Sequence, residues 1–520
     1  MDPSEALVAA VRRGGGNAVF GVPGGGSNLD LVGAATDAGM RFVLVHAESS
    51  GAIAAAAYGL VSDSVGLAIG TRGPGTTSLA NGAAQATLDR FPLVLATDCV
   101  SSADFERVAH QRLDQRAMMR PITKWSATLG LDPQSTADRA VDIARSAPAG
   151  AVHLDIDAST ASTAPSPGDP APMADDPDDE LSAIAGRARH PLVIAGIGAL
   201  VDAPSVRSAL EQIGAPVLTT YQAAGLLPAG HRLWAGLYTS GAIEREIIDR
   251  ADLVVTVGLD TVEPMPAPWY GSVPVISLDA ELPPSSFVPV TRRCLGPVAA
   301  SLRVLVDALA DHDWPVDVGR TERERTHDLL RGCTAGTFGP VELVDAVLAA
   351  APDGIITTVD AGAHFLAVMP IWPVLAPHRL LISNGLATMG FAVPAAIGAA
   401  IARPGEPVLA FVGDGGLSMT LAELETIARY RLPITVVVFD DATLSLIEIK
   451  QRSDQGGAGA VRYADVDYAG VARAMGLSAV VAESAADVAG ALEGGWDGPR
   501  LVDARIDPGP YRAIMSTVRG

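Results

Sequence analysis

The 520-residue chain has little cysteine, little basic charge and no long uninterrupted hydrophobic run. Its three cysteines, Cys99, Cys294 and Cys333, are widely spaced and odd in number, which argues against a disulfide framework and against a cysteine metal cluster. The net charge of −22 argues against non-specific nucleic-acid binding, which needs basic patches. No uncharged apolar run reaches the ~18 residues that a membrane-spanning helix needs, and residues 1–5 lack the basic start of a signal peptide. We therefore expect a cytoplasmic protein without nucleic-acid or membrane partners.

Hydrophobic residues, by contrast, make up 48% of the sequence and charged residues 18%, so the chain can bury a large core. The length corresponds to roughly three domains of about 150–200 residues each. Composition and pattern place a first domain at residues 1–160, a linker rich in Ser, Thr, Pro, Ala and Asp at 161–180, a central domain at 181–310, a polar connection at 311–337 and a third domain at 338–520.

Strand-like apolar runs alternate with helical stretches in each of these domains. In the first domain the expected strands are 18–22, 42–46, 65–70, 93–97 and 151–156. In the central domain they are 191–195, 216–219, 253–257 and 273–278. In the third domain they are 355–359, 380–383, 408–412, 434–439 and 500–506. This alternation predicts an α/β fold of three open parallel-sheet domains.

Two aspartates of the third domain follow predicted strands. Asp414 follows the apolar run 408–412 and Asp441 follows 434–439, with a predicted helix at 420–431 between them. A strand, a helix and a strand within about 30 residues form a right-handed crossover, so both aspartates end parallel strands where open α/β sheets bind ligands. Two carboxylates beside a glycine-rich turn suit Mg²⁺ bound to a diphosphate. The alternative is two ordinary strand-end aspartates.

Gly413-Asp414-Gly415 is followed, after 24 residues, by Asp440-Asp441. This arrangement resembles the cofactor signature of thiamine-diphosphate-dependent enzymes, in which GDG precedes a paired Asn. Other segments match the family in the same order: the Gly21–Gly25 turn, Glu48 with the helix that carries Tyr58, the Gly73–Gly75 turn, Gln111 ahead of Pro121–Lys124, and Ser383–Gly398. The last two resemble the acetolactate synthase branch. The resemblance covers the chain from about Gly21 to Lys450 and implies a pyrimidine-binding, a central and a diphosphate-binding domain, in that order.

The resemblance implies three catalytic residues, Glu48, Gln111 and Met389. Glu48 would hydrogen-bond the cofactor's pyrimidine and activate it, although a helix-start carboxylate favoured by the macrodipole is the alternative. Met389 would hold the cofactor bent, and its alternative is a core methionine. Gln111 would face the reacting centre and orient the acceptor carbonyl.

The resemblance also implies residues that bind the cofactor and its metal. The metal ligands would be Asp414, Asp441 and the backbone carbonyl of Thr443. His364 would contact the diphosphate, unless its role is structural. The full set of expected cofactor-binding residues is Pro23, Gly24, Gly25, Gly362, Ala363, His364, Gly385, Met389, Gly413, Asp414, Gly415, Gly416, Asp441, Thr443 and Leu444.

The expected substrate pocket contains two of three departures from the family pattern. Its residues are Gly25, His110, Gln111, Leu446, Ile447 and Lys450. Lys450 stands where anabolic acetolactate synthases carry a Trp, and it either meets a substrate carboxylate or is solvated. His110 replaces a usual Phe and either adds acid–base capacity or fills space. The third departure is Asp440-Asp441 in place of the paired Asn, which adds negative charge that a metal must offset.

The implied activity is a carboligase of acetolactate synthase type. It would decarboxylate a 2-oxo acid such as pyruvate and add the acyl carbanion to a second carbonyl. The alternative is a non-oxidative 2-oxo acid decarboxylase that releases an aldehyde. Those enzymes often carry a His-His pair, which the sequence lacks, and Thr71 stands where one group of them has a histidine. A catalytically silent paralogue is disfavoured because Glu48, Asp414 and Asp441 are retained.

The implied cofactors are thiamine diphosphate and Mg²⁺. Gly196-Ile197-Gly198 matches only part of a dinucleotide fingerprint, so the sequence does not support FAD as an additional cofactor of the central domain. In the family, the pyrimidine-binding domain of one subunit faces the diphosphate-binding domain of another. We therefore expect a homodimer or homotetramer in which Glu48 and Asp414 of one active site belong to different chains.

Overall fold

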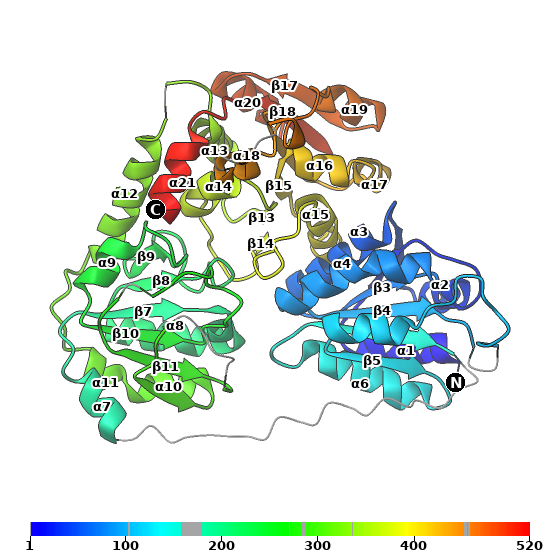
Figure 1. Ribbon diagram of the computed structural model, residues 1–520, viewed down its shortest axis with the longest axis horizontal. Helices are drawn as coiled ribbons and strands as arrows, with labels where there is room; N and C mark the ends of the chain where they lie inside the picture. Colours follow the sequence, from blue (N-terminus) through cyan, green and yellow to red (C-terminus); the bar gives the residue numbers. More distant parts are fainter. Residues whose placement is uncertain are drawn as a thin grey trace.

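The computed structural model describes residues 2–520 except 102–103, 158–178, 270, 283–287, 335, 452–454 and 456–457. Apart from its last two residues, the expected linker at 161–180 lies outside the described residues. The described strands form three six-stranded sheets, each entirely parallel (Figure 1). The predicted α/β class with three open parallel sheets is therefore confirmed.

The first sheet has the strand order β2-β1-β3-β4-β6-β5. Its strands are β1 (Ala18–Gly21), β2 (Arg41–Leu44), β3 (Gly66–Gly70), β4 (Leu93–Asp98), β5 (Trp125–Leu129) and β6 (Ala151–Ile156). Helices α1 (Pro3–Arg13), α2 (Ser27–Asp37) and α6 (Pro133–Arg145) cover one face, and α3 (Glu48–Val61) and α4 (Pro74–Leu88) cover the other. The short helices α5 (Gln115–Met119) and η1 (Arg120–Ile122) precede β5.

The third sheet repeats this topology, with the order β14-β13-β15-β16-β18-β17. Its strands are β13 (Ile356–Val359), β14 (Leu380–Ile382), β15 (Val408–Gly413), β16 (Ile434–Asp440), β17 (Ser478–Ala482) and β18 (Arg500–Arg505). The helices are α13 (Pro340–Ala350), α14 (Phe365–Ile371), α15 (Ala392–Ala402), α16 (Asp414–Met419), α17 (Glu423–Arg429), α18 (Ser445–Lys450), η3 (Ala458–Ala460), α19 (Tyr468–Ala474), α20 (Ala485–Leu492) and α21 (Tyr511–Arg519).

The central sheet has a different order, β12-β11-β10-β7-β8-β9, which is that of dinucleotide-binding folds. Its strands are β7 (Pro191–Ala195), β8 (Val217–Thr219), β9 (Trp234–Leu237), β10 (Leu253–Val257), β11 (Val275–Asp279) and β12 (Arg292–Leu295). Around it lie α7 (Asp179–Ala185), η2 (Ile197–Asp202), α8 (Ala203–Ile213), α9 (Arg245–Arg250), α10 (Val298–Val304) and α11 (Val306–Leu309).

The ligand crevice of this central sheet is filled by the chain itself. Strands β7 and β10 flank the point where the strand order reverses, and Glu263 lies there with 2% of its surface exposed. Both carboxylate oxygens of Glu263 accept the backbone N–H of Ile197 at 3.0 Å, the group that a bound phosphate would use. A side chain on Gly196 would meet the same carboxylate at 2.5 Å. In this arrangement the Ile197 N–H is already paired and is not free for a dinucleotide phosphate.

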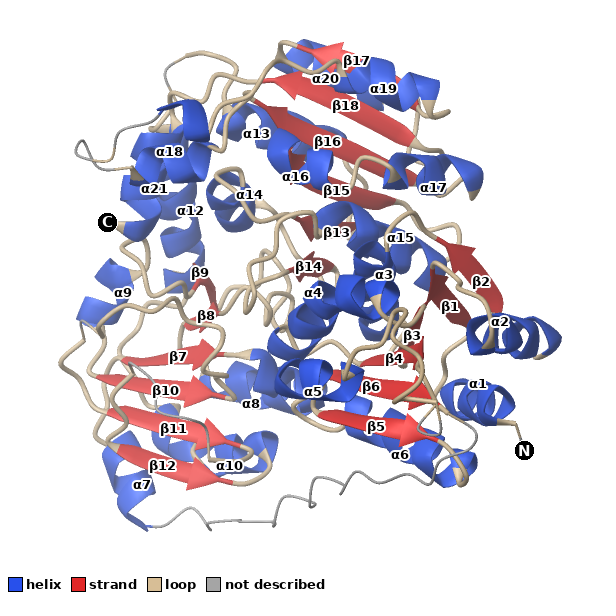
Figure 2. Ribbon diagram, turned by 45° about the vertical axis from the view of Figure 1, so that its right-hand side comes forward, coloured by secondary structure: helices blue, strands red, loops and turns tan. Residues whose placement is uncertain are grey.

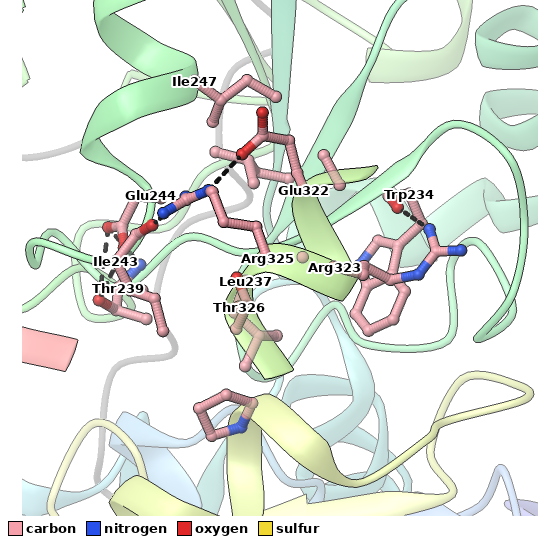
Figure 3. Close-up of a pocket in the computed structure, with 14 residues that line it drawn as sticks. Trp234, Leu237, Thr239, Ile243, Glu244, Ile247, Glu322, Arg323, Arg325 and Thr326 are labelled. Atoms are coloured by element: carbon pink, nitrogen blue, oxygen red, sulfur yellow. Dashed lines mark hydrogen bonds and ion pairs between the residues drawn. The ribbon is translucent and has the colours of Figure 1, made fainter. Parts of the chain in front are cut away.

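The expected connection at 311–337 contains helix α12 (Val318–Arg331), which packs on the central domain. A pocket between them is lined by Leu218, Trp234, Ala235, Gly236, Leu237, Thr239, Ile243, Glu244, Ile247, Glu322, Arg323, Arg325, Thr326 and Pro370 (Figure 3). Its charged side chains bind one another or the backbone. Arg325 pairs with Glu322 at 2.9 Å and donates to the Ile243 carbonyl at 2.8 Å. The pocket therefore joins domains and offers no spare charged group to a ligand.

Small residues allow the first and third domains to share one core. Helices α3, α4 and α15 lie between the two sheets (Figure 2), and residues 52–57 of α3 are almost fully buried. A Cβ on Gly398 of α15 would lie 2.0 Å from the carbonyl oxygen of Ala54. Because the two helices approach this closely, larger side chains at these positions would separate the domains.

Candidate active site

The two strand-end aspartates lie next to each other in the third domain. Asp414, which opens α16, is buried, and its carboxylate accepts the backbone N–H of Asp441 at 3.2 Å. Asp441 in turn accepts the backbone N–H of Thr443 at 3.0 Å and the hydroxyl of Ser445 at 2.6 Å. Burial and the nearby charge of Asp414 raise the pKa of Asp441 to about 7. A cation bound between the two side chains would offset the negative charge that they place together.

His364 lies beside this pair, on the neighbouring strand end after β13. Its ring stacks on Phe439 at a centroid distance of 5.1 Å and touches Gly413, where a Cβ would lie 3.3 Å from Nδ1. The side chain is buried, and burial lowers its pKa to about 3. Its Nε2 has no hydrogen-bond partner among the described residues. A buried, unpaired imidazole nitrogen is costly unless a ligand meets it.

Several expected cofactor-binding residues converge on Gly415. A Cβ at this position would lie 2.8 Å from Leu444, 3.5 Å from the Met389 methyl group and 3.2 Å from the Tyr463 hydroxyl. Tyr463 also donates a hydrogen bond to Asp414 at 2.6 Å. The sequence contains no motif that pointed to Tyr463. It reaches the site because the chain returns at residues 461–463 and pairs with the loop after β16.

Asp360 is a second residue that the sequence did not single out, although it directly follows β13, four residues before His364. Its carboxylate is fully buried and accepts the backbone N–H groups of Gly390 at 3.0 Å and Ala392 at 3.2 Å. Burial raises its pKa to about 7, against the lowering effect of these backbone hydrogen bonds. Asp360 thereby fixes the turn that carries Met389, in which Gly390 has φ +74°.

The expected first-domain residues gather at the carboxyl edge of the first sheet. Glu48 is the first residue of α3 and lies next to Gly75, where a Cβ would be 3.2 Å from the Glu48 carboxylate. Gly24 packs so closely on Thr71 that a Cβ would lie 2.3 Å from the hydroxyl oxygen. The glycine turns therefore bring the chain segments after β1, β2 and β3 together around Glu48.

Gln111 lies against the same turn in a strained conformation. Its φ is +58°, and it contacts Gly73, where a Cβ would lie 3.0 Å from the Gln111 carbonyl oxygen. Gln111 is one of eight non-glycine residues with positive φ among the described residues, a costly conformation that clusters at functional sites. The turn is held by Gln115, a buried residue missed by the sequence analysis, whose side-chain carbonyl accepts the Gly73 N–H at 2.7 Å.

The remaining expected residues lie at the edges of these clusters. In the α18 segment, Ile447 is 47% exposed and Lys450 is exposed at the end of the helix. His110 is also exposed. Gly385 lies away from Gly415, at the junction with the first domain, where a Cβ would be 2.5 Å from the Leu88 carbonyl oxygen.

Comparison with known proteins identifies the family. Three family models of thiamine pyrophosphate enzymes match successive parts of the chain: the N-terminal TPP binding domain at residues 1–118, the central domain at 179–281 and the C-terminal TPP binding domain at 360–504. The acetolactate synthase large subunit of Parasynechococcus marenigrum is 30% identical, over 91% of this chain and 82% of its own length. This chain belongs to the thiamine pyrophosphate enzyme family. Thiamine diphosphate, the expected cofactor, is thus confirmed.

Other relatives of this thiamine pyrophosphate enzyme carry two kinds of name. The acetolactate synthase of Bacillus subtilis is 29% identical, over 97% of the chain and 93% of its own length. The Pseudomonas aeruginosa protein named "Probable 2-ketoarginine decarboxylase AruI" is also 29% identical, over 86% of the chain and 83% of its own length. The acetolactate synthase-like character inferred from the sequence is therefore confirmed, whereas the relatives' names differ in the reaction. Within the described part of the chain, no helix combines the length and apolar character needed to cross a membrane.

Proposed function

We propose that this enzyme is a carboligase that decarboxylates a pyruvate-like 2-oxo acid and transfers the acyl unit to a second carbonyl compound. The similarity to acetolactate synthases along almost the whole chain carries this proposal. The strained Gln111 beside the Gly73 turn supports it, because an amide side chain there can orient an acceptor carbonyl. When bound, thiamine diphosphate supplies the electron sink that decarboxylation of a 2-oxo acid requires.

The residues around Gly415 fit the diphosphate and its metal. Asp414, Asp441 and the Thr443 carbonyl would supply the hard oxygen ligands that Mg²⁺ prefers, and a cation would offset the burial and the charge of Asp414 that raise the Asp441 pKa. The unpaired Nε2 of His364 is available to a phosphate oxygen. Positions 413, 415 and 416 at the strand end are glycines. A Cβ on Gly415 would collide with Leu444, so a side chain has no room there. Met389 supports the cofactor from the adjoining turn.

Glu48 is the residue that we propose to activate the cofactor. It is the first residue of α3 and lies beside the Gly75 turn. Its carboxylate would hydrogen-bond the pyrimidine ring and move a proton there. Pro23, Gly24 and Gly25 form the turn beside it. The acceptor pocket would be completed by the half-buried Leu446 and by His110, Ile447 and Lys450, whose exposure in the single chain suits an interface between subunits.

Simple decarboxylation is the second candidate, and the relative named as a 2-ketoarginine decarboxylase favours it. The two candidates predict different products from one substrate. The purified enzyme, supplied with Mg²⁺ and thiamine diphosphate, would be incubated with pyruvate, with and without an aldehyde acceptor. We expect a ligated hydroxyketone as the main product. Release of free aldehyde without any ligated product would contradict the carboligase proposal and support the decarboxylase.

A further inference from the structure

The helix that starts with Glu48 has no polar side chain at its N-cap. Position 47 is alanine, and no side chain within the helix caps its first turn. A helix start without a cap leaves backbone N–H groups unpaired and the entry angle of the chain poorly defined. For a helix whose first residue is the proposed activating carboxylate, this would leave the direction of that carboxylate loosely fixed.

A carboxylate from the third domain instead holds the two residues that lead into this helix. One oxygen of Glu423, on α17, accepts the backbone N–H of His46 at 3.0 Å and that of Ala47 at 3.2 Å. These are the two N–H groups directly before Glu48. The other oxygen of Glu423 accepts the hydroxyl of Thr426 at 2.8 Å. The side chain is 1% exposed, so water does not compete for these bonds.

The remaining contacts of α17 hold the same turn from outside. Arg429 donates to the Leu44 carbonyl at 2.9 Å, and the Tyr430 hydroxyl accepts the Leu44 N–H at 3.0 Å. Glu425 pairs with the ring of His46 at 2.8 Å, in a position where both side chains are about 40% exposed. Exposed pairs of this kind contribute little, whereas removing a buried acceptor leaves donors unsatisfied. Glu423 is therefore the decisive contact.

We propose that Glu423 is a positioning residue for Glu48: across the domain boundary it holds the backbone of the two residues that precede α3, and it thereby fixes where the Glu48 carboxylate points. The proposal rests on the activating role assigned to Glu48. If Glu48 and Asp414 of one chain serve two different sites, as expected for the dimer, this contact links those two sites, because α16 begins at Asp414 and α17, which carries Glu423, follows it directly. A structural change at Asp414 would then pass through α17 to the turn before Glu48 of the same chain.

Two substitutions separate position from charge. Glu423→Gln keeps the length of the side chain and an oxygen that can accept both N–H groups, but it removes the charge. Glu423→Asp keeps the charge but withdraws the oxygens by one methylene. The matched control is Glu425→Gln, on the same helix, which weakens the exposed pairs with His46 and Arg429 but leaves the hydrogen bonds of Glu423 in place. Each variant would be tested as the full chain with Mg²⁺ and thiamine diphosphate.

The readout is the rate at which the cofactor's C2 proton exchanges with deuterium in the bound state, measured by NMR after acid quench. This rate depends on cofactor activation and on neither substrate nor product. It is accompanied by kcat, KM and the dissociation constant of thiamine diphosphate. If the wild-type enzyme did not exchange faster than Glu48→Ala, the role of Glu48 itself would be wrong, whatever the Glu423 variants did.

Given wild-type exchange, we expect Glu423→Asp to lower the exchange rate and kcat together by about 10- to 100-fold, because a misplacement near 1 Å can cost about 10². KM and cofactor affinity should stay within about twofold, since the residues around Gly415 are untouched. Glu423→Gln and Glu425→Gln should stay within about threefold of wild type. Wild-type exchange in Glu423→Asp would overturn the proposal, and so would an equal loss in Glu423→Gln, which would assign the effect to charge.

Discussion

The carboxylate of Asp89, at the end of α4 in the first domain, accepts a hydrogen bond at 2.5 Å from the backbone N–H of Gly385 in the third domain. Burial raises the pKa of Asp89 to about 6, although hydrogen bonds from Ser383, Gln85 and the backbone lower it. The adjacent Arg90 pairs with Asp260 of the central domain at 2.7 Å. Two consecutive residues therefore join all three domains.

Asp89→Asn should make the enzyme more stable at neutral pH. Because the pKa of Asp89 in the folded protein is raised above its unfolded value, the protonated carboxyl stabilises the fold at low pH. This stabilisation is lost as the pH rises through about 6. Asn stays neutral and avoids this loss, which is at most roughly 3 kcal/mol for a shift of about two units. The Asn amide can be accommodated, because the side-chain oxygen of Gln85 has no partner among the described residues.

The measurement is thermal unfolding of both proteins between pH 4 and pH 7. The melting temperature of the variant minus that of the wild type should increase as the pH rises and level off above about pH 6. A difference that does not change with pH would show that the carboxylate is not the titrating group.

Glu48→Ala should leave cofactor binding intact and nearly abolish turnover. The third-domain ligands are unchanged, whereas loss of a proton-transfer group costs about 10²- to 10⁴-fold in kcat. Isothermal titration with thiamine diphosphate and a steady-state assay measure the two properties. Ser49→Ala, at the next position of α3, is the control. Turnover equal to that of the wild type would refute the role of Glu48.

Asp414→Ala should abolish Mg²⁺-dependent binding of thiamine diphosphate, because it removes one of two proposed carboxylate ligands. A chelator should have the same effect on the wild type. The control is Asp440→Asn, whose side chain faces Asp503 and Arg505 and restores the family's Asn at that position. Binding that survives chelation would overturn the metal assignment.

Affinity for Mg²⁺ should also fall as the pH drops below about 7. Asp441 has its pKa raised to about 7 by burial and by Asp414, and a protonated carboxyl is a poor metal ligand. Above that pH the ligand is ionised and the affinity should become constant. Titrations with Mg²⁺ between pH 5.5 and 8.5 test this, and a flat profile would contradict it.

Mixing two inactive variants should restore activity if each site takes Glu48 from one chain and Asp414 from another. A dimer of Glu48→Ala with Asp414→Ala then has one intact site and one site that lacks both residues. Random exchange of subunits gives about a quarter of wild-type activity. Activity would be measured after denaturation and refolding together, with each variant refolded alone as control. No recovery in verified mixed dimers would place both residues on the same chain.

The purified enzyme should carry no flavin, because Glu263 already occupies the Ile197 N–H in the central sheet. Absorbance near 450 nm and titration with FAD provide the measurement. FAD binding with micromolar affinity would show that the Glu263 loop opens, and the filled crevice would then be the wrong interpretation.

The sequence revealed most strands, and those it missed share one location. Strands β5, β9, β12 and β17 were not predicted, and each lies at the edge of its sheet. Interior strands are buried on both faces and read as continuous apolar runs. An edge strand such as β17, whose residues are mostly exposed or half-buried, has no such signal.

The same division holds for the active-site candidates. Asp414, Asp441 and Glu48 stand at strand or helix ends beside glycine turns, so local sequence was enough to select them. Tyr463, Gln115 and Glu423 lie inside unremarkable segments. They matter because of a partner that is distant along the chain, as Glu423 is from His46. Only the folded chain defines such a pair.

The sequence by itself determined the α/β class and the motifs through which the chain resembles thiamine-diphosphate-dependent enzymes, because turns and strand ends are local properties. The tertiary structure decided how those motifs are held. It merged the first and third domains through the small residues of α3 and α15, filled the central crevice with Glu263, and brought Glu423 to the start of the Glu48 helix. These contacts join side chains and backbone groups that are far apart in the chain. They depend on how the folded chain packs, and no local sequence pattern encodes that packing.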